Sequence, residues 1–275
     1  MAQRSTIGQY YQTDSRIHRM DPRVKLIGTF VFIISLFVVN NYIGYVLSGV
    51  FLAILIANSR VPFRYIVRGL KAIVFLMLIT VICNLFLTKG TPLVSFWKLT
   101  ITYEGLDFAC KMAIRLMFLI IGSSMMTLTT TPNQLTDAME SVFGPLKVFH
   151  VPVHEISMMM SIALRFIPIL TEETDKIEKA QIARGADFES RNLMKRIRSM
   201  VPLLVPLFIS AFRRANDLAM AMEARCYHGG EGRTKMKPLK YRKEDVAAYI
   251  ILAAYFVLCI LIRILGSRVD LVRFL

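Results

Sequence analysis

Long apolar runs separated by short charged segments constrain this chain more than any other feature of its sequence. Five runs contain few or no charged residues: 26–39, 42–57, 72–87, 108–128 and 246–265. Each approaches the roughly 20 residues with which a helix crosses the hydrocarbon core of a bilayer. A soluble chain of 275 residues would not be 55% hydrophobic in blocks of this kind. The sequence therefore predicts an all-α membrane protein with about five transmembrane helices.

The basic residues predict how the chain is oriented. Five of them precede the first apolar run, and the connection after the second run carries Arg60, Arg64, Arg68 and Lys71 with no acidic residue. The turn between the first two runs is uncharged. Because cytoplasmic loops are enriched in Lys and Arg, we expect a multi-pass protein of the cell membrane, in contact with the lipid bilayer, with its N-terminus in the cytoplasm.

The formal net charge of +15 does not by itself indicate a nucleic-acid partner. The topology rule explains much of this excess. The basic residues are also not interleaved with aromatic residues, as a surface that stacks bases requires. We therefore expect no nucleic acid among the partners.

The segment 131–243 is too long for a loop without structure of its own, so we expect a cytoplasmic domain of long helices there. One helix should run from about Val153 to Arg184, and a second should end at Arg225. The predicted organisation is an N-terminal cytoplasmic segment with four transmembrane helices in 1–130, the helical domain in 131–243, and a C-terminal transmembrane helix in 244–275.

Two similar tripeptides end the two long helices. They are Ala183-Arg184-Gly185 and Ala224-Arg225-Cys226, and each arginine follows an apolar stripe at helical spacing. Two matched helix ends predict two similar receptor sites. Either motif alone has a simpler explanation, because a basic residue near a helix C-terminus interacts favourably with the helix dipole and glycine is a common stop signal.

Catalytic and metal-binding motifs are absent from the sequence. It has no Gly-x-x-x-x-Gly-Lys-Ser/Thr phosphate loop, so we expect no ATP hydrolysis by this chain alone. His154-Glu155 is followed by Met158 where a zinc-protease helix would have its second histidine. Lys111 and Arg115 are interpreted as anchors near the outer interface. We predict a chain that is not an enzyme and that holds no metal.

Large apolar side chains mark the halves of the two long helices that we expect near the bilayer. They are Met158, Met159, Met160, Leu203, Leu204, Leu207 and Phe208. A domain of this size does not need them all for its own core, and methionine adapts to differently shaped partners. We interpret the set as a partner surface. The alternative is that the helices pack on each other and on the transmembrane helices.

Several segments together resemble one family, the transmembrane T component of energy-coupling-factor (ECF) vitamin transporters. They are Ala163-Leu164-Arg165-Phe166-Ile167-Pro168, Ala180-Gln181, the two Ala-Arg tripeptides, the stretch from His18 to Lys25 with its Asp-Pro-Arg-x-Lys pattern, Thr131-Pro132 and Pro145-Leu146. The resemblance covers most of the chain. One departure is Cys226, which stands where the family pattern has glycine and leaves the ending of the second helix open.

The resemblance implies a subunit that couples ATP hydrolysis to uptake of a vitamin or micronutrient. Two cytoplasmic ATPase subunits would bind the helix ends at Arg184 and Arg225, and a small membrane-embedded substrate-binding protein, the S component, would carry the substrate site. ATP and Mg would be bound by the ATPases, so we expect no cofactor on this chain. An arginine suits such docking because its planar fork can hold a carboxylate through two parallel bonds.

Two alternatives remain open from the sequence. A conventional ABC importer permease also docks on ATPases, but it has one coupling helix per subunit and this chain has two. A membrane-embedded enzyme would need polar catalytic residues facing a cavity within the spans, and the spans offer only scattered Asn84, Ser123, Ser124 and Thr127.

Overall fold

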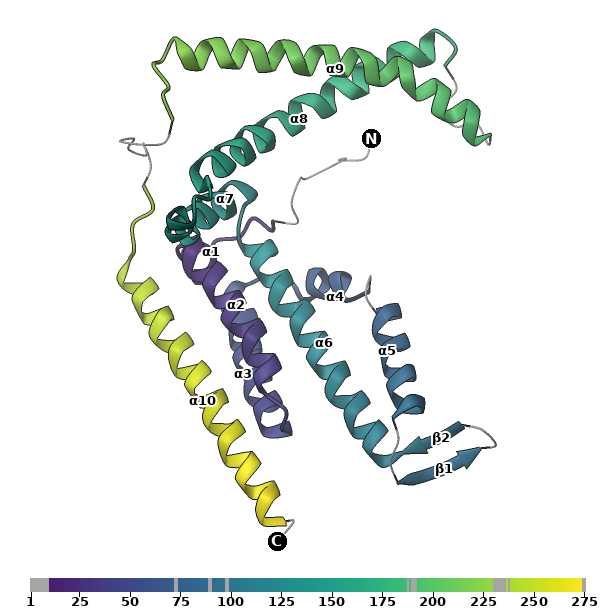
Figure 1. Ribbon diagram of the computed structural model, residues 1–275, viewed down its shortest axis with the longest axis vertical. Coiled ribbons are helices and arrows are strands. Elements are labelled where there is room, and N and C mark those ends of the chain that lie inside the picture. The colour runs from purple at the N-terminus through teal and green to yellow at the C-terminus, as the bar shows by residue number, and fades with distance from the viewer. Residues whose placement is uncertain are drawn as a thin grey trace. The chain divides into compact units, whose positions relative to one another are not determined.

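The computed structural model describes residues 10–71, 74–88, 91–96, 99–186, 188, 192–229, 236 and 238–273. These residues form helices, with one short hairpin as the exception (Figure 1). The helices are α1 (Arg16–Arg19), α2 (Pro22–Val38), α3 (Tyr42–Ser59), α4 (Phe63–Lys71), α5 (Val74–Leu87), α6 (Tyr103–Thr129), α7 (Pro132–Val142), the 3-10 helix η1 (Gly144–Phe149), α8 (Val153–Ala183), α9 (Leu193–Glu223) and α10 (Lys243–Arg273). The strands β1 (Pro92–Phe96) and β2 (Leu99–Thr102) pair antiparallel.

The chain forms two compact units. The first comprises Met1–Ala138 and Leu239–Leu275, and it contains α1 to α6, the hairpin and α10. The second comprises Met139–Pro238 and contains η1, α8 and α9. Helix α7 begins in the first unit and ends in the second.

The five apolar runs predicted as spans fall on α2, α3, α5, α6 and α10. Among the described residues, four helical stretches are long and apolar enough to cross a membrane: Tyr42–Ser59, Tyr103–Thr129, Val153–Ala183 and Lys243–Leu265. Helix α2 has 17 residues, at the short end of the range for a span. These helices confirm the all-α membrane fold with about five spans. Helix α8, predicted as part of the helical domain, passes the same test of length and composition.

Local sequence explains how α2 begins and turns into α3. Asp21 accepts a hydrogen bond from the backbone N–H of Arg23 at 2.9 Å, and Pro22 occupies the first helical turn, where its missing N–H costs nothing. After the tight turn, Gly44 lies so close to Val39 that an added Cβ would come within 2.4 Å of the valine Cγ1. Only glycine allows this approach.

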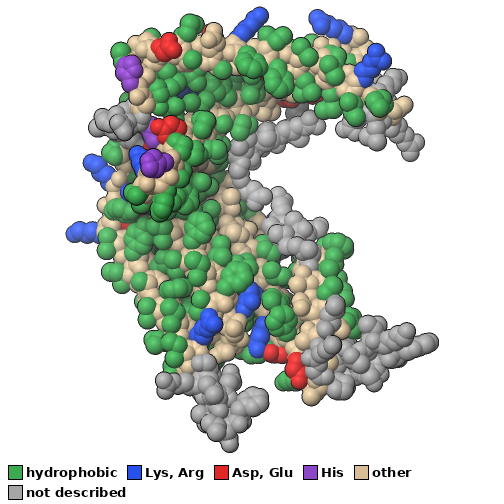
Figure 2. Space-filling model, in the orientation of Figure 1, with side chains coloured by type: hydrophobic (Ala, Val, Ile, Leu, Met, Phe, Trp, Pro, Cys, Tyr) green, Lys and Arg blue, Asp and Glu red, His purple; other side chains and the backbone are tan. Residues whose placement is uncertain are grey.

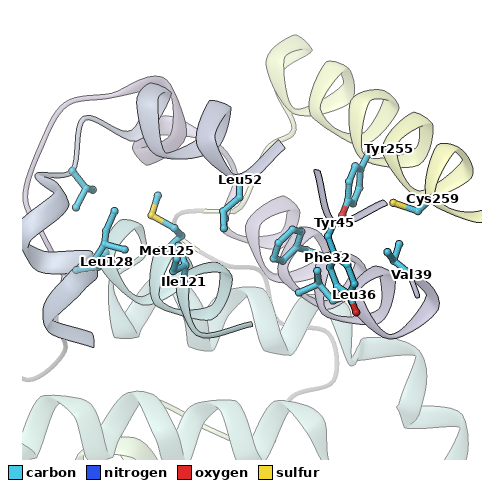
Figure 3. Close-up of a cluster of buried hydrophobic side chains, with 12 residues drawn as sticks. Phe32, Leu36, Val39, Tyr45, Leu52, Ile121, Met125, Leu128, Tyr255 and Cys259 are labelled. Atoms are coloured by element: carbon cyan, nitrogen blue, oxygen red, sulfur yellow. The ribbon is translucent and has the colours of Figure 1, made fainter. Parts of the chain in front are cut away.

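A cluster of buried apolar side chains holds α2, α3, α6 and α10 together (Figure 3). Tyr255 of α10 stacks on Phe51 with ring centroids 4.2 Å apart. Its hydroxyl lies 2.8 Å from Ser35 Oγ and 2.9 Å from Ser48 Oγ, so one phenol joins three helices. Gly122 of α6 lies against Phe32, where an added Cβ would be 2.6 Å from the ring. Glycine therefore lets α6 approach α2 closely at this position.

The two basic residues in the first half of α6, Lys111 and Arg115, bind neighbouring groups of the first unit. Arg115 donates hydrogen bonds to the Val39 carbonyl at 3.1 Å and to Asn40 Oδ1 at 2.9 Å. Lys111 donates to Asp107 Oδ2 at 2.6 Å. Arg115 thus satisfies a carbonyl left free where α2 ends, which gives it a structural role at the α2–α3 turn.

Candidate functional site

The candidate site is the pair of helices α8 and α9, which run antiparallel and are joined by polar contacts. Glu173 of α8 accepts hydrogen bonds from the Ser210 hydroxyl at 2.6 Å and from Arg214 Nη2 at 2.9 Å. Nearer the C-terminal end of α8, the Gln181 side chain donates to the Pro202 carbonyl at 3.4 Å. Residue numbers rise along α8 as they fall along α9, so the two predicted docking motifs lie at opposite ends of the pair (Figure 1).

Helix α8 ends in a compact turn at the first motif. The N–H of Arg184 donates to the Gln181 carbonyl at 3.0 Å, and the N–H of Gly185 donates to Ile182 at 2.9 Å. The N–H of Ala186 also donates to Gln181, at 3.0 Å. The last two bonds, which span three and five residues, define a Schellman ending with Gly185 as the residue after the cap.

Helix α9 ends in the same way at the second motif. The N–H of Arg225 donates to the Met222 carbonyl at 3.1 Å, that of Cys226 donates to Glu223 at 2.9 Å, and that of Tyr227 donates to Met222 at 3.1 Å. Each bond has its counterpart, at the same offset, in the first motif. Two tripeptides that share only Ala-Arg therefore form the same backbone structure.

Cys226 takes the conformation that glycine takes in the first motif. Its φ is 54°, and that of Gly185 is 88°. Both lie in the left-handed region, where a side chain costs about 1–2 kcal/mol. The second helix therefore ends with the same hydrogen bonds as the first although cysteine stands in place of glycine. The substitution raises only the conformational energy of the turn.

The two arginines are exposed at the ends of their helices. No hydrogen bond or ion pair of either guanidinium occurs within the part of the chain that the structure describes. Each sits where the helix dipole is negative, which favours a cation there. Pro202, level with the end of α8, and Arg225 are separated by about 35 Å of helix at a rise of about 1.5 Å per residue. The pair thus presents two similar cationic ends, widely separated.

The predicted partner surface consists of two groups. One lies at the start of α8 and contains Met158, Met159 and Met160, and the other lies in α9 and contains Leu203, Leu204, Leu207 and Phe208. Met159 and Phe208 have exposed fractions of 58% and 64%, and Met160 and Leu204 are exposed as well, whereas Met158, Leu203 and Leu207 are partly covered. Leu207 lies one turn before Ser210, which contacts Glu173. Met159 lies about 20 Å from Glu173 along α8, toward the start of the helix. Figure 2 shows hydrophobic side chains along α9, and the role of both groups as a partner surface stays a prediction.

Sequence reasoning missed the contacts that hold this site together. The bonds from Ser210 and Arg214 to Glu173 join residues 37 and 41 positions apart, and no local pattern reveals such a pairing. A second missed contact lies where α8 begins. Glu140 binds His154 Nδ1 at 2.9 Å and accepts a hydrogen bond from the Ser157 hydroxyl at 2.9 Å. This carboxylate fixes the last turns of α7 to the first turns of α8.

Comparison with known proteins shows extensive similarity. Residues 13–236 match the family model described as CbiQ, cobalt transport protein. A protein of Ruminiclostridium cellulolyticum named energy-coupling factor transporter transmembrane protein EcfT is 55% identical over 241 residues, which are 88% of this chain and 90% of the relative. Proteins of the same name from Clostridium kluyveri and Bacillus subtilis are 54% and 47% identical, covering 94% and 90% of this chain and 97% and 95% of the relatives.

Proposed function

This chain belongs to the family described as CbiQ, cobalt transport protein, and we propose that it is the transmembrane coupling subunit of an ECF-type importer. In this proposal it passes ATP-driven motion from two cytoplasmic ATPase subunits to a membrane-embedded S component that carries a vitamin or another micronutrient. The name shared by its relatives, energy-coupling factor transporter transmembrane protein, supports that assignment.

The observation that carries the proposal is the pair of matching helix ends at Arg184 and Arg225. Each end projects an exposed guanidinium beyond the last turn of a long helix. Each can enter a groove on one of two similar ATPase subunits and bind a carboxylate there through two parallel hydrogen bonds. Two such ends on one chain favour the ECF subunit over a conventional ABC permease, which has a single coupling helix.

The proposed role is transmission rather than catalysis. Among the described residues, no group of three or more His, Cys, Asp or Glu could hold a metal ion. In the proposal, ATP and Mg are bound by the ATPase subunits and the substrate by the S component. The antiparallel pair of α8 and α9, fastened through Glu173, acts as the stiff element between the two docking ends.

The proposed function also requires one orientation of the chain in the membrane. The basic connection after α3 and the basic N-terminus lie in the cytoplasm, as does the domain 131–243 with its two docking ends. The cell membrane is the location, and lipid surrounds the exposed apolar faces of the spans. Helix α8 then belongs to the cytoplasmic domain, a placement favoured by the charged residues in its second half: Glu172, Glu173, Asp175 and Lys176.

Co-purification tests this function. The tagged chain is solubilised in mild detergent, and the proteins that accompany it are identified. We expect two ATPase subunits and a small hydrophobic membrane protein. The double variant with Arg184→Ala and Arg225→Ala should lose the ATPases, whereas Arg213→Ala, which alters an exposed arginine of α9 between the two docking ends, should keep them. Full ATP-driven uptake by the double variant would refute docking through these arginines.

A further inference from the structure

The start of α2 binds both points at which the chain connects the first unit to the second. The chain leaves the first unit beyond α6, through Thr130 and α7, and it returns through Leu239 to α10. The end of α6 and the start of α10 are 114 positions apart in the sequence, from Thr129 to Lys243. Both nevertheless contact the stretch from His18 to Lys25.

Lys25 binds the outgoing connection. Its ammonium donates to the Thr129 carbonyl at 2.9 Å and to the His18 carbonyl at 3.1 Å. The backbone N–H of Tyr11 donates to the neighbouring Leu128 carbonyl at 2.9 Å. The last carbonyls of a helix have no partner within it, so these bonds satisfy groups that α6 cannot satisfy itself. Lys25 is 8% exposed, and burial of its charge makes the loss of either acceptor costly.

Asp245 and Arg23 bind the returning connection. Asp245 is 1% exposed, and its two carboxylate oxygens accept the backbone N–H groups of Asp21, at 2.8 Å, and of Arg242, at 2.7 Å. The Arg23 guanidinium lies 3.9 Å from the centre of the Tyr241 ring and 2.9 Å from Asp21 Oδ2. The Asp245 carboxylate and the Arg23 guanidinium therefore fix the first turn of α10, and Tyr241 just before it, to the start of α2.

We propose that these contacts form a coupling anchor, defined as Asp21, Arg23, Lys25, Thr129, Tyr241 and Asp245, in which Lys25 and Asp245 are positioning residues for energy coupling. The inference rests on the proposed function. Force exchanged between the second unit and the spans through the chain must pass through the two connections. When both are held at α2, a displacement of the second unit moves the helices of the first. When the end of α6 is released, its last turn can unwind and absorb the displacement.

The test measures substrate uptake per ATP hydrolysed by the complete transporter in lipid vesicles. Lys25→Met keeps the length of the side chain and removes its three donors. We expect the complex to assemble and hydrolyse ATP while uptake per ATP falls about fivefold, within the range by which such networks alter coupling. Arg64→Gln is the matched control, because Arg64 is an exposed basic residue of α4 outside the anchor, and it should leave the ratio unchanged.

Tyr241→Ala provides an independent test, because Tyr241 is exposed and its loss leaves the core intact. It should lower uptake per ATP about twofold. An unaltered ratio in both variants, or uptake that falls only in proportion to the amount of complex recovered, overturns the anchor. If Lys25→Met does not fold, the ratio in Tyr241→Ala alone decides. Failure of the unchanged chain to bind any ATPase would instead refute the proposed function.

Discussion

Gly185 and Cys226 occupy the same position in two equivalent helix endings, although only one of them is a glycine. Both have a left-handed φ, and the bonds from their neighbours match one to one. The shared geometry places the preceding residues, Arg184 and Arg225, in the same relation to their helix axes. In the proposed complex, two similar ATPase subunits would therefore meet the same backbone structure at the two ends.

Replacing these two residues should change stability in opposite directions. Gly185→Ala adds a side chain at φ 88° and should destabilise the fold by about 1–2 kcal/mol. Cys226→Gly removes one at φ 54° and should stabilise it by about 0.5–1 kcal/mol, because part of the relief is offset by the greater freedom of glycine in the unfolded chain. Thermal unfolding in detergent measures both. Shifts of the same sign would contradict the assigned conformations.

Each docking arginine should contribute separately to binding. Arg184→Ala and Arg225→Ala should each weaken ATPase binding by on the order of 2–5 kcal/mol if the partner carboxylate is left buried and unpaired. Lysine at either position should give an intermediate loss, since an ammonium cannot form the two parallel bonds of a guanidinium. Titration of the purified ATPase against each variant in nanodiscs gives the affinities. Equal binding by the lysine and alanine variants would argue against a bidentate contact.

Single cysteines should report the orientation. In a background without Cys83, Cys110, Cys226 and Cys259, a cysteine at exposed Lys179 should react with an impermeant reagent only from the cytoplasmic side. A cysteine at exposed Thr91 should react only from outside. Ser190 and Thr234, which also lie in the predicted cytoplasmic domain, fall outside the described residues. Outside labelling at Lys179 would overturn the orientation and the docking proposal with it.

The exposed apolar groups of α8 and α9 should differ from the docking ends in what they bind. Met159→Glu or Leu204→Glu should release the small membrane partner while the ATPases remain bound, because the change places a charge in an apolar contact. The amounts of the small membrane partner and of the ATPases that accompany each variant are both measured in one purification. Loss of the whole complex would identify these residues as core, and no change would show that they contact no partner.

The N-terminal segment should loosen in mild acid. His18 Nε2 lies 3.0 Å from the Tyr11 carbonyl and its Nδ1 lies 2.7 Å from Ser15 Oγ, while burial lowers the pKa of its ring below 6.5. A lowered folded-state pKa means that the neutral ring stabilises the fold above the unfolded-state pKa and that this contribution is lost as the pH falls below it. The protection factors for hydrogen exchange at residues 10–20, which correct for the slower intrinsic exchange in acid, should therefore fall between pH 7.5 and 5. His18→Gln should remove the pH dependence.

The spans and the helix ends could be predicted because their signals are local. Apolar runs gave α2, α3, α5, α6 and α10, and the Ala-Arg tripeptides marked the ends of α8 and α9. The amphipathic helix α4 was missed, since its nine residues lie between two stronger signals. The hairpin of β1 and β2 was missed as well.

The long-range polar contacts could not be predicted. The contact of Lys25 with Thr129 spans 104 residues, and that of Asp21 with Asp245 spans 224. Both depend on how the helices pack, and a single sequence carries no direct record of that packing. The segment from His18 to Lys25 could be recognised as a motif, whereas its role in holding two distant helices required the structure.

The Tyr255 hydroxyl, which joins α2, α3 and α10, belongs to a group of hydroxyls with fewer hydrogens than close contacts. Ser35 Oγ also lies 2.7 Å from the Phe32 carbonyl, and Ser48 Oγ lies 2.9 Å from the Gly44 carbonyl, so three hydroxyls make four close contacts. Each hydroxyl has one hydrogen to donate. At any instant at least one of the four contacts therefore lacks a hydroxyl hydrogen, and which contact lacks it can change when the hydroxyls rotate in turn. The junction of the three helices thus has several proton arrangements for one arrangement of its heavy atoms.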